Sequence, residues 1–206
     1  MKKSSTKPKG STTYKQTAFG IIPRTKLLQL ELEGTKKGLE YIATNYRDHL
    51  TPQLILKIHE IAFAWIFPDW AGKYRAIRVE YSGKEAPLPH LVPALITNLC
   101  DDLDERLMHL DKDSIEKIIE LLAWFQHSLV WIHPFQDYNG RLARMLTTLV
   151  ILQLGLPPIE IKANTKQDRE NYLQAMYSAD KGDYSKLESL IRQALDEALG
   201  KAITSK

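Results

Sequence analysis

Cysteine is almost absent from this chain, because Cys100 is the single one among 206 residues. One cysteine cannot form an internal disulfide, so the sequence indicates a reducing compartment rather than a disulfide-rich secreted domain. Long apolar runs are also absent, and nowhere do the roughly eighteen consecutive apolar residues of a membrane span occur. The first fifteen residues lack the apolar centre of a signal peptide. We therefore expect a cytoplasmic protein without a membrane partner.

Acidic residues are missing from the first fifteen positions, which contain five lysines. Removing those five charges from the net charge of +3 leaves the rest of the chain at −2. A slightly acidic domain offers no basic surface for nucleic acid, so we do not expect nucleic acid as a partner. We expect residues 1–17 to be a disordered basic tail. Residues 18–206 contain no evident linker or internal repeat, which favours one domain.

Helical periodicity dominates the rest of the chain. The first periodic segment, residues 26–46, should be a helix that Gly34 and Gly38 interrupt or weaken. Its apolar residues at roughly helical spacing are Leu28, Leu32, Leu39 and Ile42. Further helices are expected from Pro52 onward, over residues 91–107 and 113–132, from Asn139 to Gly155, and over residues 166–180 and 184–199.

A different pattern occupies residues 73–86. Ile77, Val79 and Tyr81 alternate with charged residues, and a Ser-Gly pair then predicts a turn. This pattern indicates a short β-hairpin. The sequence therefore predicts an all-α domain, a helical bundle that carries one hairpin.

The segment HPFQDYNGRLAR, residues 133–144, contains a histidine, an acid, an Asn-Gly pair and two arginines within twelve positions. Pro134 prevents simple continuation of the preceding helix, so residues 133–140 should form a loop that leads into the next one. Free backbone amides and the positive dipole end make such a helix N-terminus suited to phosphate. Arg141 and Arg144 are three residues apart, so they share a helix face and could bind phosphate oxygens together.

Two further side chains in this segment suit transfer of a phosphorus group. Asp137 is its single acid, and Mg²⁺ takes one or two carboxylates when phosphates and waters complete its shell. His133 could remove the proton of an incoming hydroxyl, because an imidazole titrates near neutral pH. Together with the phosphate-binding elements, they predict transfer of a phosphorus centre to a hydroxyl.

These residues resemble the signature of the Fic/Doc (filamentation induced by cAMP) family, H-P-F-x-[D/E]-G-N-G-[R/K]-x-x-R. The resemblance implies a Fic-like helical bundle and a protein adenylyltransferase, which transfers AMP from ATP to a Ser, Thr or Tyr hydroxyl of a target protein. It assigns His133 as catalytic base, Asp137 as Mg²⁺ ligand, and the hairpin as a flap that binds the target. It assigns nucleotide binding to Asn139, Gly140, Arg141 and Arg144.

Two positions depart from what this resemblance implies. Tyr138 stands where the family most often has glycine, and its side chain must either find a permissive backbone or crowd the nucleotide. Many relatives also carry an inhibitory helix with the pattern [S/T]-x-x-x-E-[G/N]. Glu33-Gly34 matches its end, but Gln29 replaces Ser or Thr. We expect Glu33 to face Arg144 and to inhibit the enzyme, with Glu31 as the next candidate.

Several alternatives stay open at this stage. The same site could transfer another phosphate-containing group or remove AMP from a modified protein. The domain could also be a module that binds a nucleotide or partner without catalysis. The target protein, an antitoxin partner and self-association are not decided by the sequence.

Overall fold

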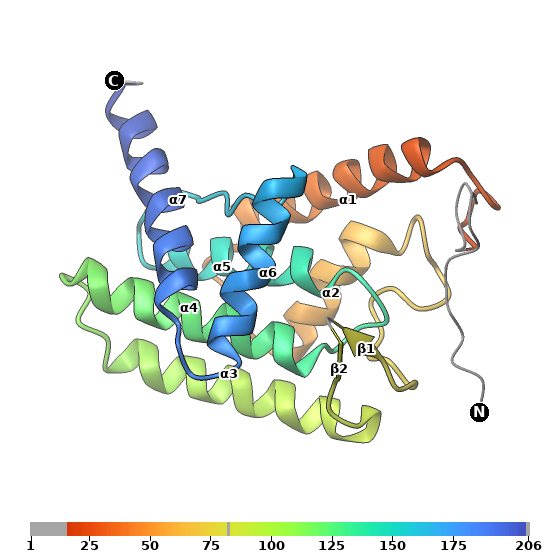
Figure 1. Ribbon diagram of the computed structural model, residues 1–206, viewed down its shortest axis with the longest axis horizontal. Helices are drawn as coiled ribbons and strands as arrows, with labels where there is room; N and C mark the ends of the chain where they lie inside the picture. The colour runs from red at the N-terminus through yellow and green to blue at the C-terminus, as the bar shows by residue number, and fades with distance from the viewer. Residues whose placement is uncertain (1–15, 82, 205–206) are drawn as a thin grey trace.

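The computed structural model describes residues 16–81 and 83–204, and it contains seven α-helices and one hairpin within them (Figure 1). The helices are α1 (Arg24–Asn45), α2 (Pro52–Phe63), α3 (Val92–Met108), α4 (Ile115–Ile132), α5 (Asn139–Gln153), α6 (Lys166–Ala179) and α7 (Ser185–Thr204). A 3-10 turn, Pro89–Leu91, precedes α3, and β1 (Glu80–Tyr81) pairs antiparallel with β2 (Lys84–Glu85). The predicted class, a helical domain with one hairpin, is confirmed.

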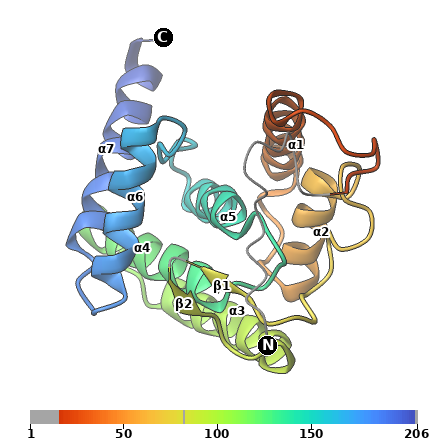
Figure 2. The ribbon, with the colours of Figure 1, turned by 45° about the vertical axis from the view of Figure 1, so that its right-hand side comes forward.

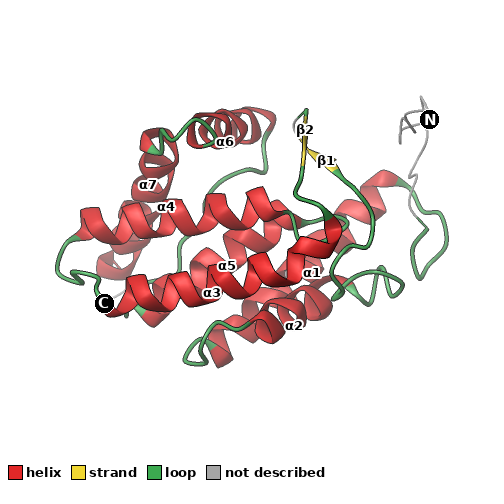
Figure 3. Cartoon of the chain, turned by 90° about the horizontal axis from the view of Figure 1, so that it is seen from below, coloured by secondary structure: helices red, strands yellow, loops and turns green. Residues whose placement is uncertain are grey.

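Helix α5 lies at the centre of the molecule. Figure 2 shows α1 and α2 on one side of it and α6 and α7 on the other, with α3 and α4 below. Figure 3 shows α3 and α4 running side by side. Leu142, Leu146 and Val150 of α5 are completely buried. Because α5 begins at Asn139, this arrangement fixes the motif loop within the core of the fold.

The first helix differs from the sequence prediction in two respects. It runs without interruption through Gly34 and Gly38, and both glycines are buried. A Cβ on Gly34 would lie 2.1 Å from the carbonyl oxygen of Ala62, so the glycine allows α1 and α2 to approach closely. Of the four apolar residues at helical spacing, only Ile42 is buried, and Leu28, Leu32 and Leu39 are exposed. The buried residues are Leu27, Leu30, Glu31, Gly34, Gly38 and Ile42.

Helix starts follow the sequence signals closely. The Thr51 side chain accepts a hydrogen bond from the Leu54 backbone N–H at the start of α2, and Ser114 caps α4 in the same way. The hairpin is shorter than the expected 73–86 segment, because Ile77 and Val79 lie outside its two-residue strands. Two strands of this length have little stability of their own, so tertiary contacts must hold them.

Most of the expected tail, residues 1–15, lies outside the described residues. Thr17 was also assigned to the tail, but it is buried and donates a hydrogen bond of 2.6 Å to the Gly20 carbonyl. The Ala18 amide donates to the carbonyl of Ile66 at 2.8 Å, which ties this segment to the residues after α2. Across residues 16–81 and 83–204, no helix is long and apolar enough to cross a membrane.

Candidate active site

The motif loop contains two residues in left-handed backbone conformation. His133 has φ 52° and ends α4, while Tyr138 has φ 64° and precedes α5. Among the described residues they are the non-glycine residues with positive φ. Such a conformation costs an L-residue about 1–2 kcal/mol, so the contacts of both side chains must compensate for it.

The His133 imidazole is oriented by its own helix and covered by the hairpin. Its Nδ1 lies 3.0 Å from the Val130 carbonyl oxygen, and this contact requires Nδ1 to carry the proton. The Nε2 atom is then left as an acceptor, the form that a general base needs. Tyr81 stacks on the ring with centroids 4.3 Å apart. Burial lowers the pKa of His133 to about 4, so the imidazole is neutral at pH 7.

The backbone of the loop is fixed by side chains from inside the fold. Asn139 accepts from the Phe135 N–H and donates to the Phe135 carbonyl, both at 2.9 Å. His59 stacks on the Phe135 ring at 3.7 Å, and its Nε2 lies 3.2 Å from the Asp137 carbonyl oxygen. No local pattern assigns His59 a role, since its partners are distant in the chain. It is a buried support of the loop.

A cavity of about 390 Å³ opens beside the start of α5. Its lining includes every nucleotide, metal and catalytic residue that the motif suggested: His133, Asp137, Asn139, Gly140, Arg141 and Arg144. Glu31, Tyr81 and Asp180 also line it. The structure therefore brings the base candidate, the Asp137 carboxylate and both motif arginines around one space.

Two arginines that line this cavity are held differently. The Arg141 Nη2 donates to Glu31 Oε2 at 2.8 Å, while its Nη1 is buried without a hydrogen-bond partner. Leaving a buried cationic donor unpaired costs about 1–3 kcal/mol or more. Arg144 lies over the Tyr172 ring, with its guanidinium carbon 5.2 Å from the ring centroid. Both arginines place positive charge beside the start of α5.

The glutamate in the cavity is Glu31, not Glu33. The carboxylate of Glu33 lies 3.2 Å from Lys37 Nζ on the outer face of α1, and its side chain is 54% exposed. Glu31 is buried and contacts Arg141 and Tyr138. The expected contact of Glu33 with Arg144 is thus replaced by one of Glu31 with Arg141. Helix geometry explains it, since Glu31 shares the buried face of Leu27 and Gly34 and Glu33 does not.

Tyr138 is accommodated by its left-handed backbone and by aromatic packing. Its ring stacks on Phe63 with centroids 4.3 Å apart, and it lies near Phe67 and Trp70. Its hydroxyl donates to Glu31 Oε1 at 2.6 Å. The residue that departs from the family signature therefore connects the motif loop to α1 and α2.

The donor set around Asp137 fits a cation that arrives with a nucleotide. Asp137 lines the cavity, and its Oδ1 accepts the Tyr138 N–H at 2.6 Å. In the described part of the chain, no group of three or more His, Cys, Asp or Glu side chains could hold a metal by itself. Mg²⁺ commonly binds one or two carboxylates together with phosphates and waters. The Asp137 carboxylate, in a cavity of about 390 Å³, meets that requirement.

Arg75 is a further residue that sequence reasoning missed. It is buried, and its guanidinium donates to the carbonyls of His133 at 2.6 Å, Pro87 at 2.6 Å and Ile77 at 3.1 Å. A cation beside the C-terminal carbonyls of α4 is favoured by the helix dipole. Arg75 therefore joins the base of the hairpin to the end of α4, and no local motif marks this role.

Residues 49–151 match the Fic/DOC family, and the chain belongs to this family. A curated relative, protein adenylyltransferase Fic from Nematostella vectensis, is 30% identical over 172 residues. The match covers 82% of this chain, and the chain spans only 38% of the relative's length.

Solved structures share the fold. A Fic domain containing signaling protein from Bacteroides thetaiotaomicron superposes with a TM-score of 0.71 at 26% identity, covering 84% of this chain and 70% of that one. BepC from Bartonella tribocorum, solved with bound AMPPNP, has a TM-score of 0.67 at 20% identity, covering 92% and 95%. The Fic fold of this chain is therefore shown.

Proposed function

We propose that this domain is a protein adenylyltransferase that moves AMP from ATP to a Ser, Thr or Tyr hydroxyl of a target protein. The observation that carries this proposal is that the guanidinium residues Arg141 and Arg144 line the same cavity as a neutral His133 whose Nδ1 holds the proton. The guanidinium groups are suited to bind an anion and the imidazole to accept a proton. The curated relatives with adenylyltransferase names support the same conclusion.

The residues take complementary roles in this reaction. His133 Nε2 accepts the proton of the acceptor hydroxyl as its oxygen bonds to the α-phosphorus of ATP. The bond between that phosphorus and the bridging oxygen breaks, and pyrophosphate leaves toward Arg141 and Arg144. Asp137 would hold Mg²⁺, which when bound neutralises phosphate charge. The backbone amides of Asn139 and Gly140 open α5 and face the anion.

The same geometry supports a resting state restrained by Glu31. Its carboxylate already occupies one arm of Arg141 and is held by Tyr138. A triphosphate must compete with this carboxylate, because two anions cannot share one guanidinium arm without repulsion. Glu31 therefore takes the inhibitory role that the sequence suggested for Glu33.

Transfer from α-labelled ATP tests both parts of the proposal. Wild type, Glu31→Ala, Glu33→Ala and His133→Ala are incubated with MgCl₂ and a cell lysate, and protein-bound label is counted. Glu31→Ala should label more than wild type, Glu33→Ala should equal wild type, and His133→Ala should label nothing. Absence of label from both wild type and Glu31→Ala would refute the adenylyltransferase assignment.

The presence of Glu31 in the cavity also favours a second candidate, hydrolytic removal of AMP. A carboxylate in the same cavity as the base could orient a water molecule toward the phosphodiester that joins AMP to a modified protein. Incubating wild type and Glu31→Gln with a protein labelled in advance by AMP separates the two. Release of AMP by wild type alone would favour removal, and transfer by Glu31→Gln alone would favour adenylylation.

A further inference from the structure

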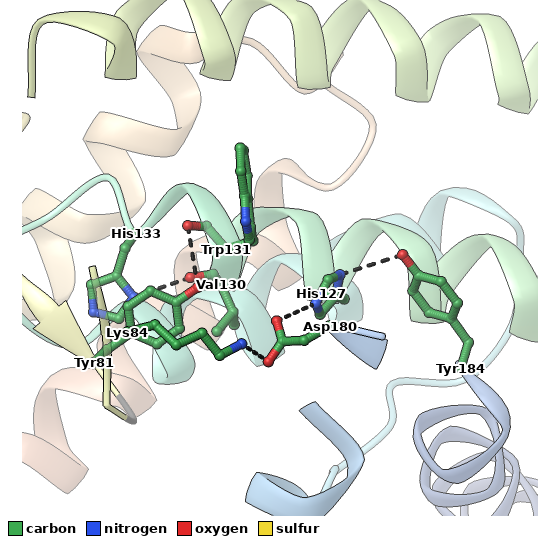
Figure 4. Close-up of polar contacts among 8 residues, drawn as sticks. All are labelled: Tyr81, Lys84, His127, Val130, Trp131, His133, Asp180 and Tyr184. Atoms are coloured by element: carbon green, nitrogen blue, oxygen red, sulfur yellow. Dashed lines mark hydrogen bonds and ion pairs between the residues drawn. The ribbon is translucent and has the colours of Figure 1, made fainter. Parts of the chain in front are cut away.

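A chain of polar contacts crosses the edge of the cavity from the hairpin to the start of α7 (Figure 4). Lys84, on β2, forms an ion pair with Asp180, the C-cap of α6. The other carboxylate oxygen of Asp180 lies 3.0 Å from His127 Nε2 on α4. The Tyr184 hydroxyl lies 3.4 Å from His127 Nδ1. The hairpin and α4 therefore meet at the Asp180 carboxylate, and Tyr184 joins the chain of contacts through His127.

The proton positions along this chain are mutually consistent. Burial, assisted by the charge of Lys84, lowers the pKa of His127 to about 4, so its ring is neutral at pH 7. The Nε2–H then donates to Asp180, and Nδ1 accepts from the Tyr184 hydroxyl. Asp180 keeps its negative charge for Lys84. Its side chain is only 17% exposed, which limits screening by solvent.

The hairpin connects Lys84 to the His133 imidazole through Tyr81. Tyr81 is the direct partner of Lys84 in the strand register, so the two residues move together. The Tyr81 ring stacks on His133 at 4.3 Å with planes 10° apart, and its hydroxyl lies 3.4 Å from the Trp131 carbonyl oxygen. Figure 4 shows Tyr81 and Lys84 side by side, with the Lys84 side chain extending toward Asp180.

The two ends of the hairpin segment are held differently. Its base is tied to α4 through the buried Arg75, which binds the carbonyls of Ile77 and Pro87. The strands beyond that base are two residues each, and Lys84 is the residue that reaches across to α6. A short hairpin does not keep its place without such an outside contact. The Lys84–Asp180 pair therefore ties the strands to α6, in addition to the contacts of Tyr81 with α4.

We propose that Asp180 is a positioning residue that holds Lys84 and so keeps Tyr81 over the His133 imidazole until a hydroxyl-bearing segment of a target protein docks on the hairpin. We call the Lys84–Asp180 ion pair the latch, and neither of its residues touches the nucleotide or the reacting atoms. They set access to the base and the affinity for the acceptor. The effect on transfer rests on the proposed function, whereas the placement of the hairpin does not.

The test compares Lys84→Met and Asp180→Asn with Lys181→Met, a matched control. Lys181 is an exposed lysine next to Asp180 in the chain. The rate at which diethyl pyrocarbonate modifies His133 is followed by peptide mass, together with hydrogen exchange of residues 80–86. Both latch variants should react and exchange several-fold faster than wild type, and the control should not. The double variant should equal the single ones, because both break one contact.

Transfer assays then separate this proposal from the proposed function. In the latch variants the KM for the acceptor protein should rise several-fold, while protection by ATP against thermal unfolding stays at the wild-type value. If no variant transfers AMP, the modification rate of His133 and the exchange rate of the hairpin still show whether the Lys84–Asp180 pair holds the hairpin in place. Rates equal to those of Lys181→Met, or effects that add fully in the double variant, would overturn it.

Discussion

A single tyrosine determines how the motif loop of this protein is anchored. Tyr138 adopts a conformation that glycine takes without cost, yet its ring is buried against Phe63 and its hydroxyl binds Glu31. Burying an aromatic side chain contributes about 1.5–3 kcal/mol, which exceeds the backbone cost of about 1–2 kcal/mol. A tyrosine in place of glycine at position 138 therefore adds backbone strain but also links the loop to α1 through Glu31.

The Tyr138 hydroxyl should matter for restraint more than for folding. Replacing Tyr138 by Phe keeps the ring and removes the donor to Glu31, a bond to a charged group that contributes about 1.5–3 kcal/mol. We expect a modest loss of stability in urea unfolding and a higher rate of AMP transfer. Adding Glu31→Ala to this variant should raise the rate no further, because both changes release the same carboxylate. A lower rate in Tyr138→Phe than in wild type would contradict this role.

The elements show where sequence patterns succeed and where they fail. The caps at Thr51 and Ser114 and the start of α5 were predictable, because each depends on a few neighbouring residues. The buried face of α1 was not. That face contains two glycines and a glutamate, which an apolar count misses, and it is defined by its fit to α2 and α5 rather than by hydrophobicity.

The close packing of α1 against α2 at Gly34 can be tested by substitution. A Cβ at Gly34 would lie 2.1 Å from a backbone oxygen of α2, which cannot rotate away as a side chain could. Gly34→Ala should therefore push α1 from α2, cost about 1–3 kcal/mol, and loosen Glu31, three residues earlier. Urea unfolding measures the first effect and AMP transfer, which should rise, the second.

Gly200→Ala is the matched control for that substitution. Gly200 lies in α7, and a Cβ there meets no atom within 4 Å. Replacing a helical glycine at an open position should stabilise the protein by up to about 1 kcal/mol. Equal behaviour of the two variants would show that the close approach at Gly34 carries no constraint.

At the scale of the whole molecule, polar side chains connect segments that are distant in the sequence. The motif residues of the site were predictable because they lie within twelve positions of one another. Their supports were not, because His59, Arg75 and Asp180 reach the site only through the tertiary fold. Long-range contacts of this kind leave no spacing signal in a single chain.

Three histidines in or around the site have lowered pKa values, which makes stability depend on pH. Burial lowers the pKa of His59 to about 3 and those of His127 and His133 to about 4. In the unfolded chain these imidazoles have a pKa near 6.5 and are protonated below that pH. In the folded protein they stay neutral until the pH approaches their lowered pKa values. Stability from their neutral forms is therefore complete above pH 6.5 and is lost as the pH falls toward 4. Each histidine contributes at most about 1.4 kcal/mol per pH unit in this window.

Urea unfolding at pH values between 6.5 and 5 measures this slope while most carboxyl groups stay ionised. His59 is fully buried, its Nδ1 accepts the Gly72 amide at 2.9 Å, and a proton there would remove that hydrogen bond. His59→Gln should therefore reduce the slope by up to about 1.4 kcal/mol per pH unit, whatever its effect on stability at pH 7. A wild-type stability that stays constant from pH 6.5 to 5 would mean that the folded protein takes up these protons as readily as the unfolded chain, and the neutral form assigned to His133 would then be wrong as well.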